Sequence, residues 1–228
     1  MQARPHRIAI YDMDKTITRA PTWTPFLVHA ARNRAPWRLA LMPIAGLYGL
    51  GYATKLIDRA RLKQLTQQLM VGRFTSRADM RALADSFAER TCATGLFEDA
   101  RARIAQDHAQ GFRLVLATAS FGYYVESIAE QLGFDGVIAT RSRFHDDDRI
   151  TALIDGENCY GPGKLRMVEA WFADQGIDRA DAEVRFYSDH VSDAPAMEWA
   201  DEAFATNPHP PLRKLAKAKG WTVLDWGK

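Results

Sequence analysis

Short apolar runs alternate along this chain with longer segments in which apolar residues recur at helical spacing. The apolar runs lie at residues 8–11, 112–117, 136–140 and 182–188, with two shorter ones inside 202–207 and 221–226. Helical patterns follow several of them, at 122–132, 164–173 and 212–219. Strands that alternate with helices are typical of a parallel sheet covered on both faces. The pattern therefore predicts an α/β fold with a doubly wound parallel sheet.

The segment between the first two strands has a helical pattern. Pro25 and Pro36 each stand at a first helical position, residues 58–71 read as a helix, and Ser76 begins a capping box. We therefore predict an α-helical unit inserted between the first and second core strands. A turn-rich segment at 143–156 predicts a small antiparallel flap.

One stretch of this insertion, from Leu39 to Thr54, carries no charge. It lies between Arg38 and Lys55 and contains a proline and three glycines. A membrane span needs about 20 apolar residues, so a span is the least expected interpretation. Two others stay open, a packed helical hairpin and a surface that touches lipid.

The composition of the chain bears on which partners it binds and in which cellular compartment it is found. The chain has 228 residues, 47% of them hydrophobic, and a formal charge of +2. A balance so close to neutral gives no reason to expect a nucleic-acid partner. The two cysteines, Cys92 and Cys159, match no metal-ligand spacing and no disulfide framework. The basic N-terminus leads into an acidic strand end without an apolar signal segment, so we expect a cytoplasmic protein, with the inner face of the membrane as an alternative.

Polar residues of complementary type stand at the ends of the predicted strands and at one helix start. They are Asp12, Asp14 and Thr16; Thr118 and Ser120; Lys164; and Asp189 and Asp193. The carboxyl ends of parallel strands share one edge of a sheet, so these residues should converge. Asp12 and Asp14 should point to the same side while the chain is extended, which brings two negative charges together.

The convergent residues favour phosphoryl chemistry. Carboxylates without histidine or thiolate form a hard oxygen site that suits Mg²⁺, which readily shares phosphate oxygens. A lysine at a glycine-rich helix start, with hydroxyls and backbone N–H groups, supplies donors for a phosphoryl group. One carboxylate can attack phosphorus and form an aspartyl-phosphate while its neighbour transfers protons. The predicted cofactor is therefore Mg²⁺.

The segments "DMDKT", "LATAS", "GPGK" and "YSDHVSD", in that order, resemble the four motifs of the haloacid dehalogenase superfamily of phosphatases. The resemblance implies a Rossmann-like core, residues 1–18 plus 97–228, and a helical cap, residues 19–96. It also implies a role for each motif residue. Asp12 would be the nucleophile and Asp14 the general acid and base. Thr118 and Ala119 would bind the phosphoryl group, and Lys164 would neutralise the negative charge of both Asp12 and the phosphate. Asp12, the carbonyl of Asp14, and Asp189 would hold Mg²⁺, with Asp193 supporting it from behind these ligands or through water.

The position of the cap is most similar to the phosphoserine-phosphatase-like branch. That branch carries a substrate-reading glutamate where this chain has Pro21, and an asparagine where it has Ser192. The apolar cap and missing glutamate look more like bacterial phosphatidylglycerophosphatase C and its relatives. The expected substrate is a lipid phosphate similar to phosphatidylglycerophosphate, with membrane contact through the cap, or a small soluble phosphomonoester. Alternatives are a phosphoserine phosphatase, a phosphotransferase, or a phospho-accepting switch domain without enzymatic activity.

Several of these residues also have a purely structural interpretation. Ser120 and Asp193 could each cap a helix, and we expect the former to do so. The aromatic residues of the insertion should pack in the core of the cap; these are Trp23, Phe26, Trp37, Tyr48 and Tyr52.

Overall fold

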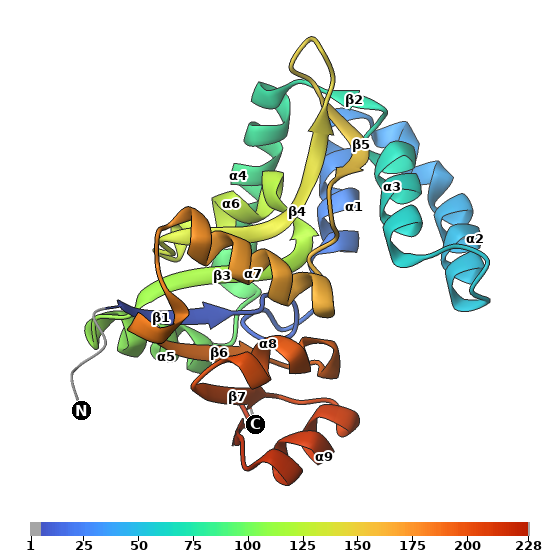
Figure 1. Cartoon of the computed structure of the whole chain (residues 1–228). Coiled ribbons are helices and arrows are strands. Elements are labelled where there is room, and N and C mark those ends of the chain that lie inside the picture. Colours follow the sequence, from blue (N-terminus) through green and yellow to red (C-terminus); the bar gives the residue numbers. More distant parts are fainter. Residues whose placement is uncertain (1–5, 228) are drawn as a thin grey trace.

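A computed structural model describes residues 6–227 and contains one eight-stranded sheet (Figure 1). Its strand order is β2-β5-β4-β3-β1-β6-β7-β8. Six strands run parallel, namely β1 (His6–Tyr11), β3 (Arg113–Phe121), β4 (Gly136–Phe144), β6 (Ala182–Ser188), β7 (Glu202–Thr206) and β8 (Thr222–Leu224). At one edge β5 (Ile150–Asp155) and β2 (Phe74–Thr75) pair antiparallel. The predicted α/β fold is confirmed, and β4 with β5 forms the expected flap.

Helices cover both faces of the sheet because alternate strand residues point to opposite sides. In β1, Ala9 and Tyr11 join one buried cluster, while Ile8 and Ile10 join the other. The first cluster contains side chains of α4 (Arg77–Thr94), α5 (Glu98–Ala109) and α6 (Gly122–Gln131). The second contains those of α7 (Pro162–Asp174), α8 (Ala194–Trp199) and α9 (Pro210–Lys219).

The predicted insertion between the first two core strands is helical. It comprises α1 (Trp23–Arg34), a 3₁₀ helix η1 (Pro36–Leu41), α2 (Met42–Ala53), α3 (Arg59–Met70) and α4, with the two-residue strand β2 between the last two helices. Two further 3₁₀ turns lie in the core, η2 (Arg179–Asp181) and η3 (Val191–Asp193). Ser76 caps α4 as expected, since its hydroxyl accepts a hydrogen bond from the Asp79 N–H. α4 shares its buried cluster with α6, so the exact boundary between cap and core stays a prediction.

The uncharged stretch forms a helix at the outer edge of the molecule (Figure 1). α2 contains no buried residue and packs mainly against α3 and η1. The expectation that Trp37 and Tyr52 pack in a cap core is wrong, because they are 64% and 44% exposed. α2 has too few neighbours to cover them, whereas Phe26 on α1 is fully buried. Within residues 6–227, no helix is long and apolar enough to cross a membrane.

Candidate active site

Lys164 lies between two buried carboxylates at the edge where the strands end. Its Nζ donates to Asp12 Oδ1 at 2.7 Å and to Asp193 Oδ2 at 2.6 Å. The Ser188 hydroxyl donates to the same oxygen of Asp193 at 2.8 Å, and the Thr16 hydroxyl donates to Asp12 Oδ2 at 3.2 Å. The structure thus brings together four of the residues that the sequence singled out, from the loop after β1, from α7 and from the 3₁₀ turn after β6.

The "GPGK" segment explains how a lysine reaches this position. Gly161, which precedes α7, has φ of +60°, a conformation that glycine adopts without strain. Gly163 has no room for a side chain, since a Cβ there would lie 2.8 Å from Glu157 Oε1 and 2.9 Å from the Asn158 carbonyl oxygen. These two glycines let the first turn of α7 approach the site closely enough for Lys164 to be buried.

The site holds more negative than positive charge. Burial raises the pKa of Asp12 to about 6, although Lys164 opposes the shift. Burial, followed by repulsion from Asp12 and Asp193, raises the pKa of Asp189 to about 7. Both carboxylates are therefore costly to ionise in the folded chain without a further cation.

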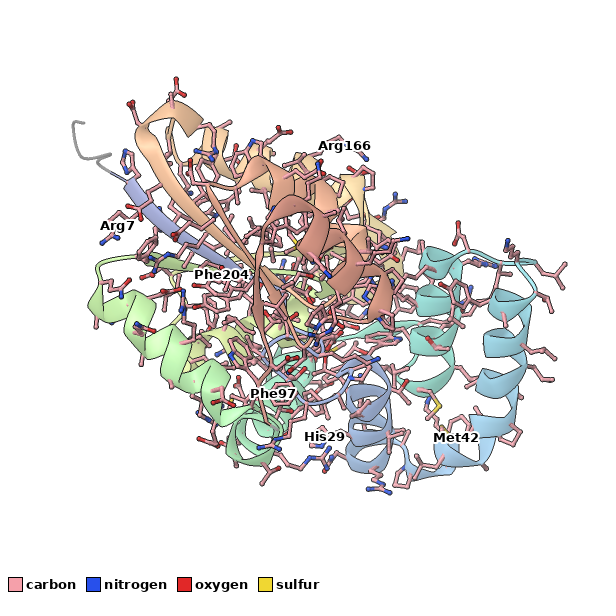
Figure 2. The ribbon with its side chains drawn as sticks, turned by 90° about the horizontal axis from the view of Figure 1, so that it is seen from below. Arg7, His29, Met42, Phe97, Arg166 and Phe204 are labelled. Carbon is pink, nitrogen blue, oxygen red and sulfur yellow. The ribbon has the colours of Figure 1, made fainter. Side chains whose placement is uncertain are left out.

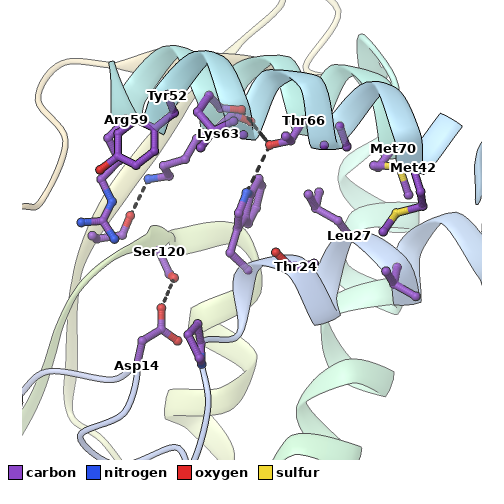
Figure 3. Close-up of a pocket in the computed structure, with 18 residues that line it drawn as sticks. Asp14, Thr24, Leu27, Met42, Tyr52, Arg59, Lys63, Thr66, Met70 and Ser120 are labelled. Atoms are coloured by element: carbon purple, nitrogen blue, oxygen red, sulfur yellow. Dashed lines mark hydrogen bonds between the residues drawn. The ribbon is translucent and has the colours of Figure 1, made fainter. Parts of the chain in front are cut away.

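Asp14 is held separately, on the side that faces the helical insertion. Its Oδ1 accepts hydrogen bonds from the N–H of Thr22 at 2.8 Å and from the hydroxyl of Thr22 at 2.7 Å. Its Oδ2 accepts one from the Ser120 hydroxyl at 3.1 Å (Figure 3). Asp12 and Asp14 thus differ in surroundings, since the first is ion-paired with Lys164 and the second accepts hydrogen bonds from Thr22 and Ser120.

Two helix-cap interpretations are wrong. α6 has no side-chain cap, because Ser120 lies in a strand that runs on to Phe121 and its hydroxyl binds Asp14 instead. Asp193 precedes α8 but does not cap it, because its carboxylate is engaged by Lys164. In both cases a longer-range polar contact replaces the local one.

The predicted phosphate-binding residues lie where β3 changes its pairing with β4. The register shifts between Thr118 and Phe121. The Thr118 hydroxyl is buried and accepts a hydrogen bond from the Ser120 N–H at 3.1 Å. The Ala119 carbonyl accepts hydrogen bonds from Lys63 at 2.5 Å and from Thr140 at 2.9 Å, which fixes the orientation of this peptide.

Lys63, on α3, is a cation at the site that the sequence analysis missed. It is 6% exposed, and besides Ala119 it binds Asn158 Oδ1 at 3.0 Å and lies over the ring of Phe121. Burial, and secondarily the charge of Arg59, lower the pKa of Lys63 to about 7. A cap residue therefore contacts the phosphate-binding segment directly.

The buried side of α3 could have signalled this residue. Lys63, Thr66, Gln67 and Met70 recur at helical spacing and are all buried. A buried helix face with three polar members needs polar partners. Sequence alone did not show that the partners of Lys63 lie in β3 and the loop before α7.

Two half-buried histidines, His190 and His209, lie beside Asp189. The N–H and ring Nδ1 of His209 both lie within hydrogen-bond distance of the Asp189 carbonyl oxygen. The ring of His190 stacks on that of His209, with centroids 4.2 Å apart. They support the turn that carries Asp189.

The donor set fits a hard divalent cation. Within residues 6–227, no side chain donates a hydrogen bond to the carboxylate of Asp189, and Asp193 Oδ1 is buried without a partner. No three His, Cys, Asp or Glu side chains in this range are arranged as a metal site. The predicted set uses only two carboxylates, of Asp12 and Asp189, plus the carbonyl of Asp14. Mg²⁺ commonly binds to one or two carboxylates and completes its shell with water and phosphate oxygens.

The raised pKa values predict how stability depends on pH and metal. An acid whose pKa is higher in the folded than in the unfolded chain stabilises the fold at low pH, and this stabilisation is lost as the pH rises. In EDTA, the Tm of wild type should fall between pH 5 and pH 8 relative to that of Asp189→Asn, by about 3 °C or more. Mg²⁺ should raise the wild-type Tm more at pH 8 than at pH 5. Thermal scans of both proteins, with EDTA and with Mg²⁺, test this.

Asp189→Asn is the matched control because it keeps the shape of the side chain and removes the titration. Parallel Tm profiles of the two proteins in EDTA would contradict the prediction. So would a Mg²⁺ shift of equal size at both pH values.

A cavity of about 480 Å³ opens from Asp14 toward the helical insertion (Figure 3). Its polar end contains Asp14, Ser120, Lys63 and Arg59. The rest is mostly apolar and is lined by α1, α2 and α3, including Trp23, Leu27, Val28, Met42, Leu62 and Met70. Pro21 also lines it, where the phosphoserine-phosphatase-like branch carries glutamate. The cavity is thus polar near Asp14 and apolar beyond it.

Sequence comparisons identify the relatives of this chain. The family model of the haloacid dehalogenase-like hydrolases matches residues 9–198. A Streptomyces azureus protein named "Inhibition of morphological differentiation protein" is 34% identical over 58% of this chain. Protein CicA of Caulobacter vibrioides is 30% identical, covering 86% of this chain and 83% of that protein. Phosphoserine phosphatase SerB1 of Mycobacterium tuberculosis is 28% identical over 65% of this chain. The matches cover only 46% and 47% of the Streptomyces and Mycobacterium proteins, so the chain spans about half the length of several relatives.

Solved structures agree with this placement. A Bordetella pertussis protein of unknown function has a TM-score of 0.86 and 26% identity, covering 96% of this chain and 98% of that one. A substrate-bound phosphoserine phosphatase has a TM-score of 0.62 at 16% identity, over 96% of this chain and 92% of that one, which supports the fold alone. Together the comparisons confirm the predicted superfamily, the haloacid dehalogenase-like hydrolases.

Proposed function

Because the chain belongs to the family of haloacid dehalogenase-like hydrolases, we propose that it hydrolyses a phosphomonoester through an aspartyl-phosphate on Asp12. The observation that carries the proposal is the ion pair of Asp12 with Lys164, which keeps one carboxylate oxygen beside a cation. The other oxygen of Asp12 attacks phosphorus, and the bond from phosphorus to the leaving oxygen breaks. Asp14 gives its proton to that oxygen.

The second half of the reaction reverses the role of Asp14. Water attacks the phosphorus of the aspartyl-phosphate, Asp14 takes a proton from this water, and Asp12 leaves as a carboxylate with release of inorganic phosphate. Thr118 and the backbone of Ala119 bind the phosphoryl oxygens, and Lys164 balances their charge. Mg²⁺, when held by Asp12, Asp189 and the Asp14 carbonyl, would neutralise the same oxygens.

We propose a lipid phosphate as the substrate, because the cavity offers an apolar region directly beyond Asp14. The apolar part of the leaving group lies between α1, α2 and α3, and Arg59 and Lys63 stand near its polar end. Pro21 offers no carboxylate to an amino group, which disfavours phosphoserine. The competing candidate is a small soluble phosphomonoester such as phosphoserine, favoured by the relative that carries that name.

A glycine of α2 tests the apolar part of the cavity. Gly49 lines the cavity, and a Cβ placed on it would meet no atom within 4 Å. Gly49→Leu should therefore fill the space without a clash. The ratio of kcat/KM for a long-chain lipid phosphate to that for p-nitrophenyl phosphate should fall by about tenfold or more, since the loss of several buried methylenes costs this much.

Gly51→Leu is the matched control, because Gly51 does not line the cavity and a Cβ there would meet only Ile57 at ordinary distances. It should leave the ratio of the two kcat/KM values unchanged. An unchanged ratio in Gly49→Leu would exclude this cavity as the site of an apolar chain.

A substrate screen decides between the candidates. It should include lipid phosphates, phosphoserine, histidinol phosphate and p-nitrophenyl phosphate, each with Mg²⁺ and with EDTA. Turnover of none of them would contradict the proposed hydrolase. A phosphoprotein stable for minutes would instead indicate a switch domain, and phosphate transferred to added alcohols or sugars would indicate a phosphotransferase.

A further inference from the structure

We infer that the outer face of α2 docks on the surface of a bilayer that contains anionic lipid. This face consists of Ile44, Leu47 and Leu50, one turn apart on the helix, with Trp37 and Leu56 at its two ends. The inference deepens the proposed function and rests on it for the identity of the substrate, a lipid phosphate.

The outer face of α2 concentrates the exposed apolar surface of the protein. Of the eleven large apolar side chains exposed within residues 6–227, five belong to this face, and two others of the same stretch, Met42 and Tyr52, line the cavity instead. Leu47, Leu50 and Leu56 are 65%, 60% and 82% exposed. Figure 2 shows the side chains of α2 projecting away from the rest of the molecule. A helix that is apolar on all sides needs either burial or lipid, and this one is not buried.

Positive charge gathers around the same face. Residues 15–78 contain eleven lysines and arginines but only one acid, Asp58, while the whole chain has a charge of +2. Lys55 and Arg61 follow α2 closely and are exposed. Neither forms an ion pair with another residue of the described range. Apolar side chains beside unpaired cations are the combination that binds anionic lipid surfaces.

The two sides of α2 have complementary surroundings. The inner side, with Met42, Gly46 and Gly49, lines the cavity that reaches Asp14. If the outer side of α2 rests on a bilayer, the cavity lies on the other side of the same helix. A lipid phosphate would then have to move only around α2 to reach Asp14. With 12 residues α2 is too short to span, so it would lie in the interface.

The charge also argues against a second copy of this chain as the occupant. A two-fold dimer places the same surface on both sides of its interface. Docking α2 on α2 would bring two basic segments together, and like charges repel. An anionic bilayer neutralises them instead.

Flotation of the full chain with vesicles tests the inference. Vesicles of phosphatidylcholine with about one third phosphatidylglycerol should bind the protein at least about tenfold better than pure phosphatidylcholine, and less well when salt rises from about 0.1 to about 0.5 M. The double variant Leu47→Asp with Leu50→Asp should lose at least about tenfold in binding. Leu153→Asp, which alters an exposed leucine of β5, should bind like wild type.

The outcomes separate this inference from the proposed function. The double variant should hydrolyse p-nitrophenyl phosphate in solution like wild type, because neither leucine lines the cavity. Binding that the double variant retains, or that wild type lacks, would overturn the docking surface. So would a wild-type dimer that the double variant loses, since a second copy would then cover the face. Vesicle binding without any phosphatase activity would instead contradict the proposed function and leave the docking surface intact.

Discussion

Asp12→Asn is expected to abolish turnover of every phosphomonoester that the wild-type protein hydrolyses. The amide has the shape of the carboxylate but cannot attack phosphorus, so kcat should fall by at least about 10⁴-fold. The fold should persist, because Lys164 keeps its ion pair with Asp193 at 2.6 Å. Steady-state rates with p-nitrophenyl phosphate and Mg²⁺, measured beside the Tm, provide the test.

Two controls sharpen this result. Asp174→Asn, at the exposed end of α7, should keep full activity. Acid quenching of wild type with a ³²P-labelled substrate should trap a phosphoprotein that Asp12→Asn does not form. The Tm of Asp12→Asn should not fall, because burial already raises the pKa of this acid and its charge is costly. Retention of a tenth of the wild-type rate would exclude Asp12 as the nucleophile.

The sequence predicted the sheet and the acidic edge because both depend on local patterns. Ile8 to Tyr11 form a buried strand, and a strand of a parallel sheet must deliver Asp12 to the common edge. The same reasoning placed Asp189 after β6. Lys164 was predicted from its place in the ordered set of motifs, and the structure shows what its glycines do: Gly161 has a positive φ, and Gly163 has no room for a side chain.

Contacts between distant segments could not be read from local patterns. Lys63 looked like any helix lysine, because its partners Ala119 and Asn158 lie 56 and 95 residues away. Ser120 looked like a helix cap because nothing local showed that Asp14 would lie within 3.1 Å. The exposure of Trp37 depends on how few neighbours η1 and α2 have at the edge of the molecule.

The helical insertion both contacts the candidate active-site residues and forms the wall of the cavity that leads to them. Thr22, just before α1, donates two hydrogen bonds to Asp14, and Lys63 on α3 binds the carbonyl of Ala119. Both contacts join the insertion to predicted catalytic or phosphate-binding residues. A movement of α1 or α3 should therefore change the position of Asp14, the acid that we propose transfers protons, as well as the size of the cavity.

Lys164→Met should cause the largest loss of stability, together with loss of activity. The side chain is 2% exposed and is the ion-pair partner of both Asp12 and Asp193. Methionine fills similar space but leaves two buried carboxylates without their cation, which costs about 3–5 kcal/mol. Urea unfolding at pH 7.5 in EDTA should show this decrease in the free energy of unfolding, and kcat should fall by about 10³-fold or more because the charge of the phosphoryl group is no longer balanced.

Two comparisons distinguish the loss of charge from the loss of packing. Lys164 lowers the pKa of Asp12 against the effect of burial, so its removal should raise that pKa further above its value of about 6. At low pH an acid with a raised folded-state pKa is protonated and carries no buried charge. Lys164→Met should therefore lose less stability at pH 5 than at pH 7.5. Adding Asp193→Asn to Lys164→Met should restore about 1–2 kcal/mol, because it removes one of the unpaired charges. A loss that is equal at both pH values and unaffected by Asp193→Asn would show that Lys164 acts through packing, and would remove the electrostatic basis of the proposed site.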